Sequence, residues 1–283
     1  MLTDYHLHLR PDDADATVER FYTPANAERY RIAASEQGIE ELGVSEHVYR
    51  FRQALELWRH PFWEGFAVDD LDEYCSFVRE QTDLRLGIEA DFVAGAEDRT
   101  AALLEARDLD YVVGSVHFIR DGAVDMDDFG VWDPRRADLS ADKIWSRYFE
   151  TVAESARSGL FDIIAHPDLV KIWGPDRPER FPERDVRFYY EPAVEAFAEA
   201  GVAVEVSTAG LRKPVGEIYP SRAFLEMCLE AGLPIALSSD AHRPADVGAG
   251  YEQALELLDE LGVRELSVFE HRQRRLASVG PST

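Results

Sequence analysis

The chain has 283 residues, of which 46% are hydrophobic and 11% aromatic, so it can fold around a substantial core, and disorder is not the default expectation. Its formal net charge of −25 disfavours nucleic acid as a partner, because binding along a phosphate backbone needs a basic stripe. Two cysteines (Cys75 and Cys228), no apolar run of about 18 residues and no basic-then-apolar leader exclude a disulfide framework and indicate a soluble, cytoplasmic protein with no membrane partner.

Short β-rich runs alternate with amphipathic helical patterns along the chain. The β-rich runs are "LTDYHLH" (2–8), "ELGVSEH" (41–47), "LRLGIEA" (84–90), "YVVGSVH" (111–117), "FDIIAH" (161–166), "VAVEVS" (202–207) and "PIALSSD" (234–240). The helical patterns cover residues 23–38, 99–109, 140–159, 189–201, 221–232 and 246–262, and a glycine ends most of them. This alternation predicts the α/β class, with parallel strands joined by right-handed crossovers in one barrel. We expect a single domain over residues 1–270 and a loose tail over 271–283.

Nearly every β-rich run ends in a histidine or a carboxylate. In a barrel of parallel strands, the C-terminal strand ends meet on one face, where the loops build the site. His6 and His8 are two residues apart in a strand, so they project to the same side and can bind one ion together. We therefore expect one convergent set at the strand ends: His6, His8, Glu46, His47, Glu89, His117, His166, Glu205, Asp240 and His242.

Each of these signals is weak when it stands alone. A single histidine such as His47, His117 or His166 is more often a hydrogen-bonded core residue than a ligand, so the hypothesis depends on their shared position. Asp15, in the acidic loop "RPDDADA", fits either a solvated loop charge or a ligand. Three further carboxylates are interpreted either as groups that orient imidazoles or as simple strand-end polarity: Asp4, Glu46 and Glu205. Two histidines are expected to be structural or solvent-facing: His60 and His271.

The number of candidate ligands indicates more than one metal ion. The candidates are His6, His8, Asp15, His47, Glu89, His117, His166, Asp240 and His242. A single catalytic zinc takes three protein ligands, whereas nine suit two or three divalent ions about 3.5–4 Å apart. Carboxylates such as Glu89 and Asp240, at the ends of apolar runs, are costly to bury unless they are paired or coordinated. Imidazole-rich ligation favours Zn, Mn or Fe over Mg or Ca.

The motifs "DYHLH", "SEH", "GIEAD", "SVHF", "AHPD" and "SSDAH" resemble, in order, those of the PHP (polymerase and histidinol phosphatase) family. The resemblance implies a distorted (β/α)7 TIM-like barrel and a metal-dependent phosphoesterase. It also implies that His6, His8, Glu89 and Asp240 hold one ion; that Glu89, His117 and His166 hold a second; and that Asp15, His47 and His242 hold a third. The residues that would carry the catalysis are His6, His8, Glu89, His117, Asp240 and His242.

Two segments are similar to the histidinol-phosphate phosphatase branch of that family. They are "EVSTAGLRKPVGEIYPS" (205–221) and "AHPDLVK" (165–171). This similarity implies hydrolysis of L-histidinol phosphate to L-histidinol and phosphate, in histidine biosynthesis. It leaves open another small phosphate ester as the substrate, and nothing in the sequence fixes the oligomeric state.

Four long connections follow the strand ends, at residues 48–70, 118–140, 167–188 and 207–220, and such loops are usually functional. In so acidic a chain, basic groups in them suggest a phosphate clamp, formed by Arg212, Lys171 and Lys213. Arg177 and Arg180 are weaker candidates, since a loop cation also pairs with nearby acids. Loop position alone suggests three residues that could close over a cationic substrate: Asp125, Trp132 and Asp133.

Three alternatives belong to other functional classes. An amidohydrolase also begins with two histidines on strand one, but it commonly bridges its metals with a lysine at the end of strand four, where this chain has His117. A PHP-type nuclease is disfavoured by the net charge of −25. A catalytically inactive PHP scaffold module would be free to lose ligands, and this chain has kept the full set.

Overall fold

The computed structural model describes residues 1–13, 16–133, 135 and 140–279. Its centre is a parallel sheet in the order β1-β2-β3-β4-β7-β8-β9. The strands are β1 (Thr3–Asp4), β2 (Glu41–His47), β3 (Arg85–Asp91), β4 (Tyr111–Ser115), β7 (Ile163–Ile164), β8 (Ala203–Ser207) and β9 (Ile235–Ser238). The amide of His8 donates to the carbonyl of Ala241 at 2.8 Å, which links the last strand to the first. The predicted α/β barrel is therefore confirmed, and it is nearly closed.

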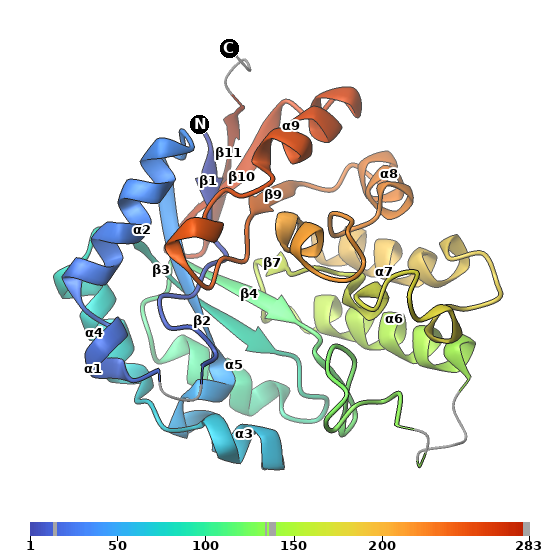
Figure 1. The fold of residues 1–283 in the computed structure, drawn as a ribbon, viewed down its shortest axis with the longest axis horizontal. Helices are drawn as coiled ribbons and strands as arrows, with labels where there is room; N and C mark the ends of the chain where they lie inside the picture. Colours follow the sequence, from blue (N-terminus) through green and yellow to red (C-terminus); the bar gives the residue numbers. More distant parts are fainter. Residues whose placement is uncertain (14–15, 134, 136–139, 280–283) are drawn as a thin grey trace.

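Helices surround this sheet (Figure 1). The longer ones are α2 (Pro24–Glu36), α4 (Leu71–Gln81), α5 (Glu97–Glu105), α6 (Ala141–Arg157), α7 (Arg187–Ala200), α8 (Arg222–Glu230) and α9 (Tyr251–Glu260), and the short ones are α1 (Val18–Phe21) and α3 (Pro61–Phe66). The predicted start of α2 is confirmed, because Thr23 accepts a hydrogen bond from the amide of Asn26 and Pro24 follows it. Helix α4 confirms the helix-like stretch around Cys75, for which no bounds were predicted, and Asp70 caps it by accepting from the amides of Asp72 and Glu73.

The long connections contain short elements of their own. These are β5 (Phe118–Ile119), β6 (Gly122–Ala123) and the 3-10 turns at Val48–Arg50, Arg52–Glu56, Leu169–Lys171, Pro178–Arg180, Thr208–Arg212 and Pro244–Asp246. Among the described residues, no helix combines the length and the apolar character that crossing a membrane requires.

The inside of the barrel is filled mainly by aromatic and small side chains. Tyr111 is fully buried there, and Tyr5 packs on it with ring centroids 4.9 Å apart. Two glycines leave space for the Tyr111 ring. A Cβ at Gly87 would lie 2.3 Å from Cζ of Tyr111, and a Cβ at Gly43 would lie 2.4 Å from the hydroxyl of Tyr111. The glycines in "ELGV" and "LRLGIE" are thus explained by close approach of a side chain to the backbone.

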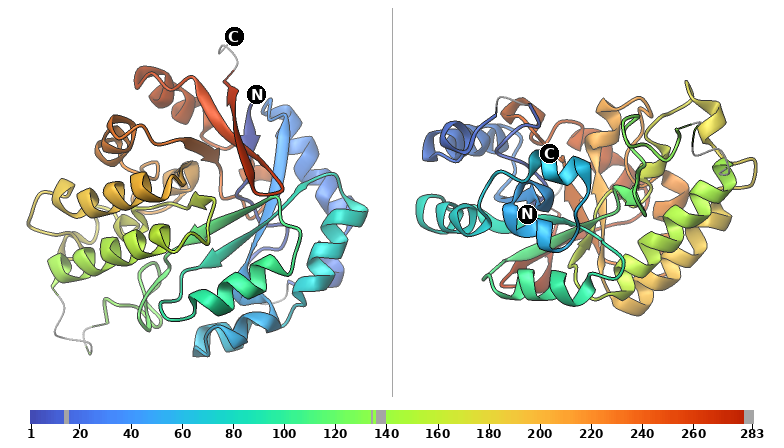
Figure 2. Two further views of the ribbon diagram at one scale, coloured as in Figure 1. Left: turned by 180° about the vertical axis from the view of Figure 1, so that it is seen from behind. Right: turned by 90° about the horizontal axis from the view of Figure 1, so that it is seen from below.

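The expected loose tail is wrong for most of its length. Strands β10 (Glu265–Glu270) and β11 (Gln273–Ser278) form an antiparallel hairpin that lies over one end of the barrel (Figure 2). Val268 and Phe269 belong to the same buried cluster as the interior tyrosines. The turn residues His271 and Arg272 both have positive φ, a geometry that Asn-Gly usually signals, so the sequence gives no visible sign of the turn.

Candidate metal centre

The C-terminal ends of the parallel strands bring the predicted ligands to one place. Eight of the nine candidates are described by the structure and converge, and the ninth, Asp15, lies outside the described residues. The side chains of His6, His8 and Glu89 are at most 1% exposed, and His242, the most open of the set, is 25% exposed. This convergence follows from the barrel, because β1 and its neighbours run in parallel and end at one rim.

Glu89, at the end of β3, is the centre of the cluster. Its Oε2 lies 3.2 Å from Nε2 of His6 and 2.5 Å from Nδ1 of His47. Its Oε1 lies 3.2 Å from Nε2 of His166 and 3.4 Å from Nε2 of His117. Oε2 also lies 3.6 Å from Nε2 of His8, so one carboxylate oxygen faces three imidazoles and the other faces two. A ligand that bridges two ions needs such an arrangement.

Asp240, after β9, closes the other side of the cluster. Its Oδ1 lies 3.4 Å from Nε2 of His8, 3.8 Å from Nε2 of His6 and 3.6 Å from Nδ1 of His242. The backbone at Asp240 has φ of +50°, which is uncommon for a non-glycine residue. Arg212 Nη2 donates to the carbonyl of Asp240 at 3.2 Å and to that of the preceding residue at 2.6 Å, so it holds this conformation.

Three groups of donor atoms are compact enough to hold one ion each. Within each group, the donor atoms all lie within 4.8 Å of one another. The groups are His6, His8 and Asp240; His6, Glu89 and His166; and His8, His47 and His242.

Carboxylates behind the cluster fix the orientation of two imidazoles. His6 Nδ1 lies 2.7 Å from Oε1 of Glu205, and His117 Nδ1 lies 2.8 Å from Oδ1 of Asp91. A proton shared with these carboxylates sits on Nδ1, which leaves the Nε2 lone pair free to face the centre. Glu205 also accepts from the backbone amide of His166 at 2.7 Å, so one side chain positions two candidate ligands. The orienting role predicted for Glu205 is thereby confirmed.

The other two carboxylates expected to orient imidazoles act mainly on the backbone. Asp4 accepts from the amide of His6 at 3.3 Å and not from its ring. Glu46 accepts from the amides of Leu9 at 2.8 Å and Arg10 at 3.1 Å, and its carboxylate lies 3.8 Å from Nδ1 of His8.

Two residues at the centre were not predicted from the sequence. Asp91 carries no assigned role in the motif "GIEAD", although it follows Glu89 by two residues and so lies on the same face of the strand. Asp12 lies 3.2 Å from Nε2 of His242 and 2.5 Å from Nη2 of the buried Arg50. Nothing in the run "RPDDADA" distinguishes Asp12 from its acidic neighbours.

Burial and the clustered carboxylates shift the pKa values of the centre in opposite directions. Burial raises the pKa of a carboxylate, but the histidines around Glu89 outweigh it and hold its pKa well below the ordinary range. Burial alone would lower the pKa of His6, but Glu205 and Glu89 outweigh it and raise that pKa well above 6.5. Burial dominates at His47, whose pKa falls to about 3. Burial also opposes protonation at two further histidines, but neighbouring carboxylates outweigh it and raise the pKa of His117 to about 10 and that of His8 above 6.5.

The donor set fits divalent metal ions. Several buried atoms at the centre make no hydrogen bond within the described part of the chain, among them His6 Nε2, His8 Nε2, Glu89 Oε2 and Asp240 Oδ1. Buried polar atoms are otherwise almost always hydrogen-bonded, and these carry lone pairs that face one another. Imidazole nitrogen and carboxylate oxygen are the ligands of Zn, Mn and Fe.

A pocket of about 240 Å³ opens onto the centre. Among the residues proposed to bind substrate, Lys213 lines it, is exposed and forms no ion pair with any residue that the structure describes. Aromatic side chains form one wall, including Tyr49, Phe62, Phe66 and Phe118. The pocket therefore offers a cation, an apolar wall and the metal ligands together.

Lys171 requires a correction, because the structure places it away from this pocket. Its side chain is 3% exposed, and its ammonium lies 2.8 Å from Glu217, 3.1 Å from Asp168 and 2.9 Å from the carbonyl of Ile218. Three protein acceptors use its three donors, so none is left for a substrate phosphate.

The remaining loop candidates also have protein partners. Arg180 lies 2.7 Å from Asp127 and stacks on Trp173 at 3.8 Å, and Arg177 lies 3.8 Å from Glu179. Asp133 pairs with Arg135 at 2.6 Å, and the indole of Trp132 donates to the carbonyl of Val124. Of the three residues expected to close over a substrate, only Asp125 lines the pocket within the described part of the chain.

The two control histidines lie outside the cluster, as expected. His60 is buried and accepts from the amide of Phe62 through Nδ1, which caps α3. His271 lies in the turn between β10 and β11, 3.0 Å from Asp108.

Comparison with known proteins agrees with this geometry. Residues 22–209 match the family model of the PHP domain. A protein of Deinococcus radiodurans named "Probable histidinol-phosphatase" is 33% identical over 96% of this chain and 98% of its own. The histidinol-phosphatase of Bacillus subtilis is 29% identical over 63% of this chain and 70% of its own.

Among solved structures, one similar to this chain is histidinol phosphate phosphatase from Lactococcus lactis, which was determined with zinc, L-histidinol and phosphate. Its TM-score is 0.69 at 17% identity, and the match covers 97% of this chain and 98% of that protein. The histidinol phosphatase structure from Listeria monocytogenes also has a TM-score of 0.69, at 19% identity, with 89% of this chain and 99% of its own covered. These structures share the fold. With two thirds of its length matched by the family model and a relative similar over almost all of it, this chain belongs to the PHP domain family.

Proposed function

We propose that this chain is a metal-dependent phosphomonoesterase that hydrolyses L-histidinol phosphate to L-histidinol and phosphate, in histidine biosynthesis. The observation that carries the proposal is Glu89, whose two oxygens face five histidines at the C-terminal ends of four strands. The name of the Deinococcus radiodurans relative, similar over nearly the full length of both chains, supports the choice of substrate.

Two or three ions of Zn, Mn or Fe are the proposed cofactors. His6, His8, Glu89 and Asp240 would hold one ion; Glu89, His117 and His166 a second; and His47 and His242, with Asp15, a third. Bound divalent ions supply a nucleophile at neutral pH and neutralise the charge that develops on the phosphate.

The residues of the chain itself prepare the site for this chemistry. Glu205 and Asp91 hold His6 and His117 with Nε2 toward the centre. Lys213, in the pocket lining, would attract the phosphate and orient it. Asp125 Oδ1 is buried without a hydrogen-bond partner in the described structure and lines the same pocket, so it would accept from the substrate ammonium.

The wall formed by Tyr49, Phe62, Phe66 and Phe118 would pack against the imidazole ring and exclude water. Arg212 keeps its proposed role beside the phosphate, through support of the backbone at Asp240. Its Nε also lies 3.9 Å from Asp246, and the guanidinium donors that these two contacts leave over would bind the phosphate.

The proposal is tested with metal-loaded protein and a panel of phosphate monoesters that includes L-histidinol phosphate. A p-nitrophenyl phosphodiester and an N-acyl amide serve as counter-substrates, because the former reports a nuclease-like activity and the latter an amidohydrolase-like one. Glu89→Gln is expected to lower kcat at least 10³-fold. Glu265→Gln, at the exposed start of β10, is the matched control and is expected to leave kcat unchanged.

Preferential cleavage of the diester or the amide would overturn the proposed reaction. Faster turnover of another monoester would keep the reaction and replace the substrate. No release of phosphate from any metal-loaded sample would favour the inactive scaffold module.

The cytoplasm is the proposed location. Cys75 and Cys228 are both free thiols, which fits a reducing compartment.

A further inference from the structure

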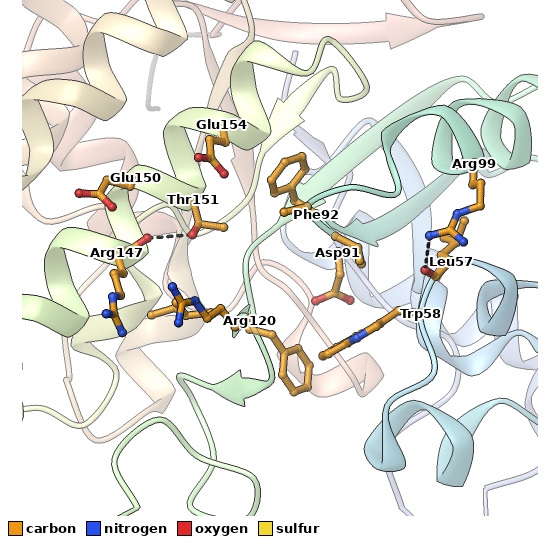
Figure 3. Close-up of a pocket in the computed structure, with 14 residues that line it drawn as sticks. Leu57, Trp58, Asp91, Phe92, Arg99, Arg120, Arg147, Glu150, Thr151 and Glu154 are labelled. Atoms are coloured by element: carbon orange, nitrogen blue, oxygen red, sulfur yellow. Dashed lines mark hydrogen bonds between the residues drawn. The ribbon is translucent and has the colours of Figure 1, made fainter. Parts of the chain in front are cut away.

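A second cleft, of about 510 Å³ (Figure 3), adjoins the metal centre, because Asp91, which holds His117, is part of its lining. Four parts of the chain line it: the segment before α3, the exit of β3 with the start of α5, the β5–β6 turn, and the outer face of α6. Phe118 is part of the lining of both the cleft and the substrate pocket, so a single side chain separates them there. The function proposed above gives this cleft no role.

The cleft collects charged side chains that do not neutralise one another. Arg99, Arg120 and Arg147 line it, and within the described structure none forms an ion pair with a carboxylate. Figure 3 shows Arg120 and Arg147 at one end and Arg99 at the other, where its Nη2 donates to the carbonyl of Leu57 at 3.1 Å. In a chain with 55 acidic and 30 basic residues, unpaired arginines that share one cleft are unexpected.

Acidic side chains lie on the same wall. Glu150 and Glu154, which are exposed residues of α6, line the cleft at the end where Arg147 lies (Figure 3), and they too are without ion pairs in the part of the chain that the structure describes. Charges of both signs therefore face one space without contact between them. A small molecule that carries both an anionic and a cationic group would satisfy both sets at once.

The rest of the lining is apolar and aromatic. Trp58 and Phe92 lie between the two arginine ends (Figure 3), and Phe118 also lines the cleft. They offer a flat surface against which an apolar or ring-shaped side chain would pack. The combined requirement is a carboxylate, an ammonium and an apolar side chain, which is the chemistry of an α-amino acid.

Asp91 connects this cleft to the metal centre. It is 3% exposed and lines the cleft, and its Oδ2 has no hydrogen-bond partner among the described residues. Its other oxygen, Oδ1, holds Nδ1 of His117 at 2.8 Å. A ligand that donated a hydrogen bond to Oδ2 would change the position or the charge distribution of the carboxylate that orients His117. It would also contact Phe118, which follows His117 in the chain.

We propose that this cleft binds a free α-amino acid and that its occupancy changes the metal affinity of the neighbouring centre through Asp91 and His117. The carboxylate is held by Arg120 and Arg147, and the ammonium donates to Oδ2 of Asp91. Glu150 and Glu154 add negative charge to the same cleft. Because coupling between two sites is reciprocal, the metal changes the affinity for the amino acid by the same factor. Typical coupling of this kind is about 5- to 150-fold.

Binding is tested by titration calorimetry of the full-length, metal-loaded protein with the proteinogenic amino acids, L-histidine included. Acetate, inorganic phosphate and ethylamine are the single-charge probes. We expect at least one amino acid to bind with a Kd below about 1 mM, as many small metabolites do, and at least about tenfold more tightly than any single-charge probe. Equal affinity for acetate or phosphate would overturn the amino-acid assignment.

The site is located with matched arginine variants. Arg147→Gln and Arg120→Gln are each expected to weaken binding at least about tenfold. Arg157→Gln is the control, because Arg157 lies on the same helix, is exposed and pairs with Glu199 outside the cleft. Unchanged affinity in both cleft variants, or no binding by any amino acid, would overturn the site, whatever the outcome of the phosphatase assay.

The coupling is tested separately, by measuring zinc affinity with a competing chelator in the presence and absence of the bound amino acid. We expect a shift of at least about fivefold in the wild-type chain. In Asp91→Asn, the shift is expected to disappear while the amino acid still binds. An identical zinc affinity with and without the amino acid in the wild-type chain would overturn the proposed link to His117.

Discussion

Glu205 offers a sharp test of how the carboxylates behind the cluster support the metal centre. Its Oε1 accepts from His6 Nδ1 at 2.7 Å and from the hydroxyl of Ser238 at 2.6 Å, and its Oε2 accepts from the amide of His166 at 2.7 Å. Glu205→Gln keeps the shape but replaces one oxygen by an NH₂ group. In either orientation, this NH₂ group faces a donor, the Nδ1–H of His6 or the N–H of His166, so one contact becomes repulsive.

The expected loss follows from the role of such groups. Removing the partner that orients a metal-bound imidazole typically costs 10–100-fold in metal affinity, which corresponds to about 1.4–2.7 kcal/mol. Since Glu205 positions two candidate ligands, we expect the Glu205→Gln variant to lie at the upper end, near about 100-fold. Zinc affinity is measured by competition with a chelating dye, and circular dichroism establishes that the variant is folded.

Ser238→Ala is the matched control. It removes one donor to the same carboxylate and leaves His6 and His166 in place, so the metal affinity is expected to stay within about threefold of the wild-type value, as for one neutral hydrogen bond. If Glu205→Gln bound zinc within about threefold of the wild-type protein, Glu205 would not act through the imidazole, and the reasoning would be refuted.

Three further predictions follow from the centre and from the fold. Chelation should lower the temperature of unfolding and added zinc should restore it, because a ligand at about 100 times its Kd stabilises the native state by about 2.7 kcal/mol; an unchanged unfolding temperature would argue against a preformed site. His47→Ala should lower the metal content measured by plasma mass spectrometry, whereas His60→Ala should leave it unchanged and cost about 0.5–2 kcal/mol through the lost cap of α3; equal metal loss in both would contradict the assignment. Burial alone would raise the pKa of Asp110, but Arg79 and the amide of Leu86 outweigh burial and lower this pKa. The contribution of Asp110 to the free energy of unfolding is therefore present at neutral pH and is lost as the pH falls through the folded pKa. In urea unfolding of metal-free protein, Asp110→Asn should therefore be less stable than the wild type by about 1–2 kcal/mol at pH 7, with the difference shrinking toward pH 3, and a constant difference would contradict this sign.

The C-terminal ends of the strands could be predicted from the sequence because two signals coincide there, the end of an apolar run and a histidine or carboxylate. Each β-rich run is short and mostly apolar, and each ends in a histidine or carboxylate, so the parallel barrel and the meeting of His6, Glu89 and Asp240 follow from one another. The role of Asp91 was accessible by the same logic, since it lies two residues beyond Glu89 on the same face of β3.

Other features depend on partners that are distant in the sequence. Lys171 lies in the connection after a strand, where phosphate-binding residues are expected, but its ammonium forms an ion pair with Glu217, 46 positions away in the sequence. The turn of the C-terminal hairpin uses His271 and Arg272 at positive φ, where local sequence preferences point elsewhere. In both cases tertiary contacts override the local pattern, and no periodicity reveals them.

The opposed pKa shifts at the centre explain why so many histidines gather around so few carboxylates. Buried carboxylates such as Glu89 and Asp240 need positive charge nearby, and the chain alone can supply it only by protonating imidazoles. His6, His8 and His117 meet that need, since neighbouring carboxylates raise their pKa values. His47 does not, because burial lowers its pKa to about 3. The metal-free cluster therefore balances its charge by holding protons in a buried site, which desolvation opposes. With divalent cations bound, every histidine can be neutral and every carboxylate ionised, so the electrostatic strain of the metal-free centre is itself a source of its affinity for metal.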